Sequence, residues 1–75
     1  MNQKILQIIQ NIIEENDLPK IENSEITEDS VLADDLGLDS LNLAQLTVEV
    51  ESEFGVDIFE NGVISTVGDI FKQLK

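Results

Sequence analysis

Six consecutive residues near the middle of the chain read Leu36-Gly37-Leu38-Asp39-Ser40-Leu41. They join a long irregular segment to the strongest helical pattern in the sequence. The glycine allows a tight bend just before the serine. Serine is a preferred N-cap residue, because its hydroxyl can accept a hydrogen bond from a free backbone N–H one turn into the helix. We therefore expect Ser40 to stand where a helix begins and to be the residue on which the function depends.

The residues that follow predict a helix from Ser40 or Leu41 to about Phe54, closed by Gly55 in the left-handed position after the helix. Helical rotation divides its apolar residues into two stripes. The first suits the core and consists of Leu43, Leu46, Val50 and Phe54. The second is surplus to a small core and consists of Leu41, Ala44 and Val48. Apolar patches with acidic rims mark interaction sites, although scattered surface hydrophobes are also common.

Two further helices are expected near the ends of the chain. The first runs roughly from Asn2 to Glu15, and Asn16-Asp17 and Pro19 close it. Its apolar residues recur at helical spacing: Ile5, Leu6, Ile8, Ile9, Ile12 and Ile13. The last helix starts at Thr66, which forms a capping-box pattern with Asp69. Both apolar faces predict packing against a common core.

The connection from Asp17 to Asp39 is long for a compact domain, and such loops are often functional. Its apolar residues predict that it lies along the helices, and Ser30 is expected to cap a helical turn from Val31 to Asp35. Its acids lack the ligand spacing and central glycine of a calcium loop, so we expect only weak, diffuse cation binding. They are Glu25, Glu28, Asp29, Asp34 and Asp35.

Between Gly55 and Thr66 the pattern predicts a short helical turn or an irregular packed segment. Asn61-Gly62 is also a hairpin signal, but the apolar runs beside it are too short for convincing strands. The prediction is therefore an all-α fold, a small four-helix bundle over a single domain of residues 1–75. It has three main helices, one short helix or turn, and a long loop between helices 1 and 2.

Composition excludes several classes of function. The chain has 16 Asp and Glu against 4 Lys and Arg, a formal net charge of −12. This charge disfavours nucleic acid and anionic membranes, and it favours partners with basic docking surfaces. The chain has no Cys and no His. It therefore lacks a thiol nucleophile, the usual general base and the commonest metal ligands, and we expect no metal site and no enzyme activity.

Ser40 also makes a poor hydrolase nucleophile, because the second glycine of a nucleophile elbow is missing along with the histidine. No apolar run is long enough to span a bilayer. The N-terminus lacks the basic region and apolar core of a signal peptide, so we expect the protein in the cytoplasm. We also expect it to be a monomer.

The stretch around Ser40 resembles the Gly-x-Asp-Ser-Leu attachment motif of acyl carrier proteins. The resemblance extends to the acidic run of residues 51–58 at the end of the second predicted helix, and to Thr66-Val67 opening the last one. It covers most of the chain, with order and spacing in agreement. A bare Asp-Ser-Leu is a weak signal, but within a small acidic helical domain it is specific.

The resemblance implies a four-helix bundle whose Ser40 hydroxyl is linked to 4′-phosphopantetheine, taken from coenzyme A by a magnesium-dependent phosphopantetheinyl transferase (holo-carrier synthase). The terminal thiol of this arm would hold acyl intermediates as thioesters and present them to loading and condensing enzymes with basic docking patches, in fatty-acid, polyketide or other specialised biosynthesis. Asp39 would help to engage the transferase and its metal. The expected recognition face consists of Asp39, Leu41, Ala44, Val48, Glu49 and Glu53.

Some positions depart from the pattern of carriers in fatty-acid synthesis. Asn42 and Gln45 stand where acids are usual, Ala44 is small for a docking residue, and the segment before Thr66 is short and carries Gly62. These departures favour a specialised carrier, for a polyketide or other dedicated pathway or for aminoacyl or peptidyl groups. The alternative from another class is an unmodified acidic adaptor that only docks basic proteins.

Overall fold

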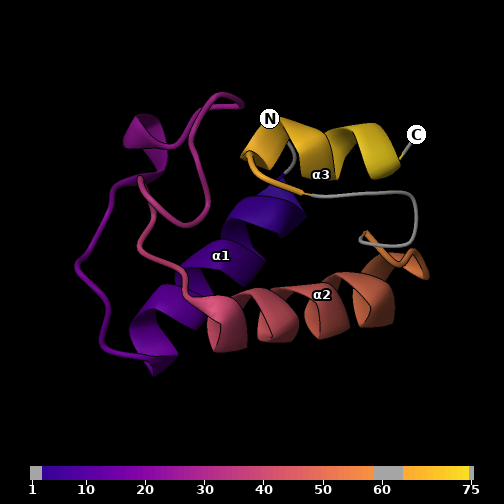
Figure 1. Ribbon diagram of the computed structural model, residues 1–75, viewed down its shortest axis with the longest axis horizontal. Helices are drawn as coiled ribbons and strands as arrows, with labels where there is room; N and C mark the ends of the chain where they lie inside the picture. Colours follow the sequence, from indigo (N-terminus) through magenta and orange to yellow (C-terminus); the bar gives the residue numbers. More distant parts are fainter. Residues whose placement is uncertain (1–2, 59–63, 75) are drawn as a thin grey trace.

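The computed structural model describes residues 3–58 and 64–74, and its regular elements are helical (Figure 1). They are α1 (Gln3–Glu15), the short 3-10 helix η1 (Asn23–Glu25), α2 (Ser40–Phe54) and α3 (Val67–Gln73). In the view of Figure 1, α1 runs obliquely between α2 and α3. The predicted small all-α bundle with a long loop between its first two main helices is confirmed. The short helical turn or irregular packed segment predicted between Gly55 and Thr66 lies largely outside the described residues, and so does the Asn61-Gly62 hairpin signal.

Helix α1 supplies the largest share of the core. All six apolar residues that predicted this helix are buried: Ile5, Leu6, Ile8, Ile9, Ile12 and Ile13. Each fully buried side chain of this size contributes about 1.5–3 kcal/mol relative to exposure. The helix ends as expected at Asn16-Asp17, where Asp17 adopts the left-handed conformation at φ 54° and the Leu18 N–H donates to the Ile13 carbonyl at 2.9 Å.

The long connection between α1 and α2 is packed, as its apolar residues predicted. Four of its side chains are buried in the core: Ile26, Leu32, Leu36 and Leu38. Leu18 and Ile21 pack against the same core. Helix η1 lies within this connection and was not predicted, because three polar residues leave no apolar periodicity to detect. The spacing of Glu22 and Glu25, which form a capping box, is the feature of the sequence that could have indicated this helix.

The long connection also holds the start of α3. The N–H groups of Val67 and Gly68 donate to the carbonyls of Ser30 and Glu28, at 3.1 and 2.8 Å. Thr66 Oγ1 accepts from the N–H of Asp69, which completes the predicted capping box. A helix of seven residues is too short to be stable in isolation. The loop therefore satisfies N–H groups that a helix start would otherwise leave free.

The predicted capping role of Ser30 is wrong. Its hydroxyl faces backward along the chain, and Ser30 Oγ accepts from the Thr27 N–H at 2.9 Å. The turn that follows is closed by Asp35, whose Oδ2 accepts from the Val31 N–H at 2.7 Å. The longer aspartate side chain reaches back across this turn, so the serine is not needed there.

The ionisation of Asp69 should make stability depend on pH. The Ser65 and Thr66 N–H groups donate to Asp69 Oδ2 at 2.9 and 3.0 Å and hold the pKa of this carboxyl below its ordinary value of 3.8. A lowered folded-state pKa stabilises the fold above the unfolded value, and this contribution is lost as the pH falls through the folded value.

Asp69→Asn keeps an acceptor but cannot ionise. The difference in unfolding free energy between the wild type and this variant should be constant near neutral pH and should shrink as the solution is acidified below about pH 4. Urea unfolding followed by circular dichroism across this range measures it. A difference that grows on acidification would contradict the assignment.

Candidate functional site

A bend at Gly37 and the buried side chain of Leu38 place the backbone just before Ser40. Gly37 adopts φ 74°, a conformation that glycine reaches without steric cost, as the sequence predicted. Leu38 then enters the core, and its N–H donates to the Leu32 carbonyl at 3.0 Å. The buried side chain and this hydrogen bond fix the backbone two residues before the serine.

The N-cap of α2 is Asp39 and not Ser40, so the predicted capping role of the serine is wrong. Asp39 Oδ1 accepts from the Asn42 N–H at 2.9 Å, and Asn42 Oδ1 accepts from the Asp39 N–H at 3.1 Å. This reciprocal pair is a capping box. If Ser40 were the cap, Leu43 would occupy the third helical position and could not complete the box.

Ser40 is consequently the first residue of α2 and is exposed. Its hydroxyl has no hydrogen-bond partner among the described residues, and neither do the N–H groups of Ser40 and Leu41. A helix N-terminus with free N–H groups favours an anion. The hydroxyl is therefore accessible for modification, and the backbone beside it suits a negatively charged group.

Helix α2 presents two apolar faces, as predicted. Leu46 and Val50 are buried, with Leu43 and Phe54 packed against the same core. On the opposite side, Leu41 is 77% exposed and Val48 66% exposed, and Ala44 between them is exposed as well. The surplus stripe thus lies on the surface and begins beside Ser40.

Gln45 joins the two longest helices. Its Nε2 donates to Glu15 Oε1 at 2.7 Å, and its Oε1 accepts from Asn16 Nδ2 at 3.2 Å. This contact spans about thirty residues of sequence, so helical periodicity could not have found it. Gln45, which stands where an acid is expected, is therefore hydrogen-bonded to residues at the C-terminal end of α1.

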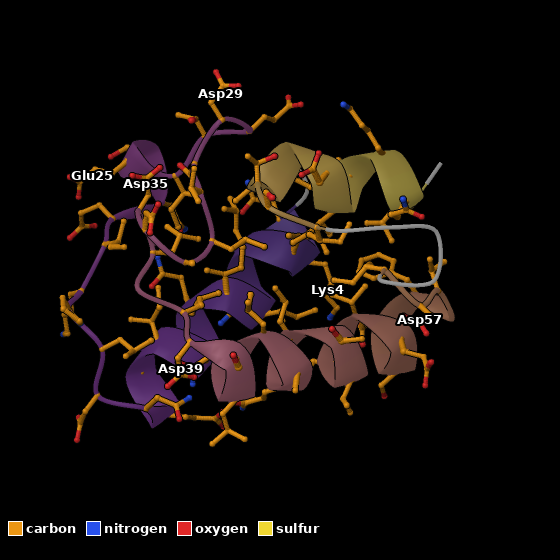
Figure 2. The ribbon with its side chains drawn as sticks, viewed as in Figure 1. Lys4, Glu25, Asp29, Asp35, Asp39 and Asp57 are labelled. Atoms are coloured by element: carbon orange, nitrogen blue, oxygen red, sulfur yellow. The ribbon has the colours of Figure 1, made fainter. Side chains whose placement is uncertain are left out.

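Glu49 and Glu53 lie on the flank of α2 that faces α1, apart from the exposed apolar stripe. Glu53 Oε1 pairs with Lys4 Nζ at 2.9 Å, and Figure 2 labels Lys4 on α1. Glu49 lines a shallow groove of about 220 Å³ between the two helices, together with Gln7 and Asn11. Its Oε2 is buried and has no hydrogen-bond partner among residues 3–58 and 64–74. The structure therefore separates these two acids from the residues they were grouped with.

The loop acids do not assemble into a metal centre in the described part of the chain. Glu25, Asp29 and Asp35 carry labels in Figure 2 and line an open hollow, yet no group of three or more such side chains there could hold an ion. Asp35 is already engaged by the Val31 N–H. Over residues 3–58 and 64–74, no helix is both long and apolar enough to cross a membrane.

Comparison with known proteins identifies relatives of this chain. A family model described as a phosphopantetheine attachment site matches residues 3–71. An acyl carrier protein of Thermotoga maritima is 46% identical over 57 residues, which cover 73% of this chain and 70% of that relative. The matched span contains the exposed serine, its cap, the helices α1, η1 and α2, and α3 up to residue 71.

The unpaired oxygen of Glu49 should destabilise the fold. Burying a charged oxygen without a partner is costly, and an uncharged amide costs less. Because Glu49 is only half buried, Glu49→Gln should raise the unfolding free energy by less than about 1 kcal/mol. Urea unfolding measures this change.

Glu51→Gln is the control, because Glu51 is exposed on the same helix and the substitution changes the net charge equally. Salt screens exposed charges far more than buried ones. The gain from Glu49→Gln should therefore persist at high salt, whereas any gain from Glu51→Gln should fade. Equal salt dependence of the two gains would show that burial is not the cause.

Proposed function

Because this chain belongs to the acyl carrier protein family, whose members bear phosphopantetheine, we propose that Ser40 is the attachment point of its 4′-phosphopantetheine arm. The single observation that supports the assignment is the exposed, unpartnered hydroxyl of Ser40 at the start of α2. The free N–H groups beside it suit the phosphodiester, which a helix N-terminus stabilises by about 0.3–1 kcal/mol when exposed.

The arm supplies the thiol that the chain itself lacks and that carries acyl groups as thioesters. In the transfer, Ser40 Oγ forms a new bond to the phosphorus atom, and the phosphoanhydride bond of coenzyme A breaks. Adenosine 3′,5′-bisphosphate leaves, and the hydroxyl proton passes to a base on the transferase. The chain has no histidine to take this proton, which is consistent with an external enzyme. We assign Asp39 to contacts with the transferase and its metal.

Family membership implies partners of two kinds, a phosphopantetheinyl transferase and the biosynthetic enzymes that use the carrier. We propose that both dock on the exposed stripe of Leu41, Ala44 and Val48, beside Asp39. Glu49 and Glu53 lie at the α1 flank of this face, where Glu53 already pairs with Lys4. The net charge of −12 favours basic docking surfaces on these partners. We also propose that the chain acts as a monomer in the cytoplasm, in one domain and without catalysis of its own.

For the pathway, we propose a specialised carrier in preference to one of general fatty-acid synthesis. Asn42 and Gln45 are neutral, and both are engaged within the fold, so neither offers charge to a basic partner. The small side chain of Ala44 offers little apolar surface in the middle of the docking stripe. Polyketide, aminoacyl and peptidyl carriers are the classes that fit this description.

Attachment at Ser40 is tested by incubating the protein with coenzyme A, magnesium and a broad-specificity transferase. The wild type should gain the mass of one phosphopantetheinyl group, and Ser40→Ala should gain none. Ser52→Ala is the matched control, because Ser52 is an exposed serine on the same helix. Since Ser40 does not cap α2, its substitution should change stability by less than about 0.5 kcal/mol. An unmodified wild type would favour the adaptor alternative.

Docking on the exposed stripe predicts a separate kinetic effect. Leu41→Ser and Val48→Ser should each raise the KM of the transferase for this protein by about tenfold, because each removes apolar area buried in the complex. Both side chains are mostly exposed, so thermal unfolding should stay close to that of the wild type. Unchanged KM values in both variants would exclude this face as the docking surface.

A further inference from the structure

The capping boxes of α2 and α3 serve different first residues. In α3, the pair Thr66 and Asp69 precedes and follows Val67, which is buried in the core. In α2, the pair Asp39 and Asn42 encloses Ser40, which is exposed. Core packing holds the first residue of α3, whereas the side chain of Ser40 is exposed and has no hydrogen bond within the described residues. Its orientation depends on the backbone on either side of it.

Asn42 is unusually buried for a polar residue in the first turn of a helix, with 3% of its surface exposed. It binds Asp39 at two points. Its side-chain oxygen accepts from the Asp39 N–H, and its own N–H donates to the Asp39 carboxylate, at 3.1 and 2.9 Å. Both the backbone and the side chain of Asp39 are thereby fixed to the helix.

The backbone of Asp39 is extended, with φ −87° and ψ −176°. Leu38 anchors it from the core on one side, and Asn42 closes it from the helix on the other. We call these two contacts, of Leu38 with the core and of Asn42 with Asp39, the clamp. Because the Ser40 hydroxyl has no partner among the described residues, the clamp sets the direction of its Cα–Cβ bond. Loss of the Asn42 acceptor would leave the Asp39 N–H unpaired and free the backbone that carries the serine.

We propose that Asn42 is a positioning residue for the modification of Ser40. This inference rests on the proposed attachment at Ser40. Asn42 acts through Asp39: its side-chain oxygen holds the capping box closed, so the serine hydroxyl meets the transferase in one orientation. The amide supplies the needed acceptor at a buried position without adding charge. Since the exposed stripe supplies most of the proposed docking surface, Asn42 affects the turnover of the transfer more than the affinity of the transferase for the protein.

The test measures steady-state transfer of phosphopantetheine from coenzyme A to each variant by intact mass. Asn42→Ala should lower kcat by about tenfold, because small errors in the placement of a nucleophile are costly. Its KM should stay near that of the wild type. Asn42→Gln restores a neutral acceptor of the kind that is usual at this position of a capping box, so its kcat should recover most of the way to the wild-type value.

Asp69→Ala is the matched control, because it removes the corresponding residue of the α3 capping box, away from Ser40. It should leave kcat unchanged at a temperature where circular dichroism shows both variants folded. Equal slowing by Asn42→Ala and Asp69→Ala would reduce the effect to general destabilisation and overturn the inference. Normal turnover of Asn42→Ala, or turnover of Asn42→Gln as slow as that of Asn42→Ala, would overturn it as well. A wild type that takes up no phosphopantetheine at Ser40 would refute the attachment itself.

A second measurement needs only the wild-type protein and so does not depend on the folding of a variant. Amide hydrogen exchange followed by NMR should show protection of the Asp39 N–H, which donates to Asn42. The N–H groups of Ser40 and Leu41 should exchange faster, since they have no acceptor in the described structure. If Asp39 exchanged as fast as these two, the clamp would be absent and the inference would fail.

Discussion

The burial of the long connection between α1 and α2 is the constraint on which the rest of the structure depends. Its apolar side chains occupy core positions that a bundle of this size would otherwise fill with helices. Its carbonyls at Ser30 and Glu28 hold the first turn of α3, and its last core residue, Leu38, fixes the approach to α2. Both the shortest α-helix and Ser40 are thus placed by a segment with little regular structure.

The same constraint explains why α3 can be so short. A helix of seven residues gains too few internal hydrogen bonds to offset the entropy of its formation. The loop supplies acceptors for the N–H groups of Val67 and Gly68, and Thr66 supplies one for Asp69. At Gly68 the loop lies so close that a Cβ would stand 3.0 Å from the Glu28 carbonyl oxygen. The contact between loop and helix therefore relies on the absence of a side chain there.

Sequence reasoning located the main helices because their apolar residues recur at helical spacing, which reports burial directly. It failed at the first residue of α2, where Asp39 and Ser40 are both good N-cap residues. The choice between them depends on which one has a suitable capping-box partner three residues later. Asp39 has such a partner in Asn42. Asn is not the usual partner in a capping box, so the signal was weak.

Contacts between helices also could not be predicted from the sequence. Periodicity shows which face of α2 is apolar, but not that Gln45 meets the end of α1 or that Glu53 meets Lys4. These pairs depend on how the helices cross, which is a property of the packed bundle. The exposed stripe could be predicted because it is surplus to any core of this size.

The neutral residues near Ser40 have an explanation within the fold. Gln45 donates to Glu15 at the C-terminal end of α1, where Glu14 and Asp17 add further negative charge. An acid at position 45 would meet like charge there, at a helix end that already disfavours anions. Asn42 is buried in the cap, where a second carboxylate would lie against Asp39. If internal contacts account for both positions, discrimination between partners falls to the side chains that the fold leaves free. These are Leu41, Ala44 and Val48, which no contact within the described bundle requires to be apolar.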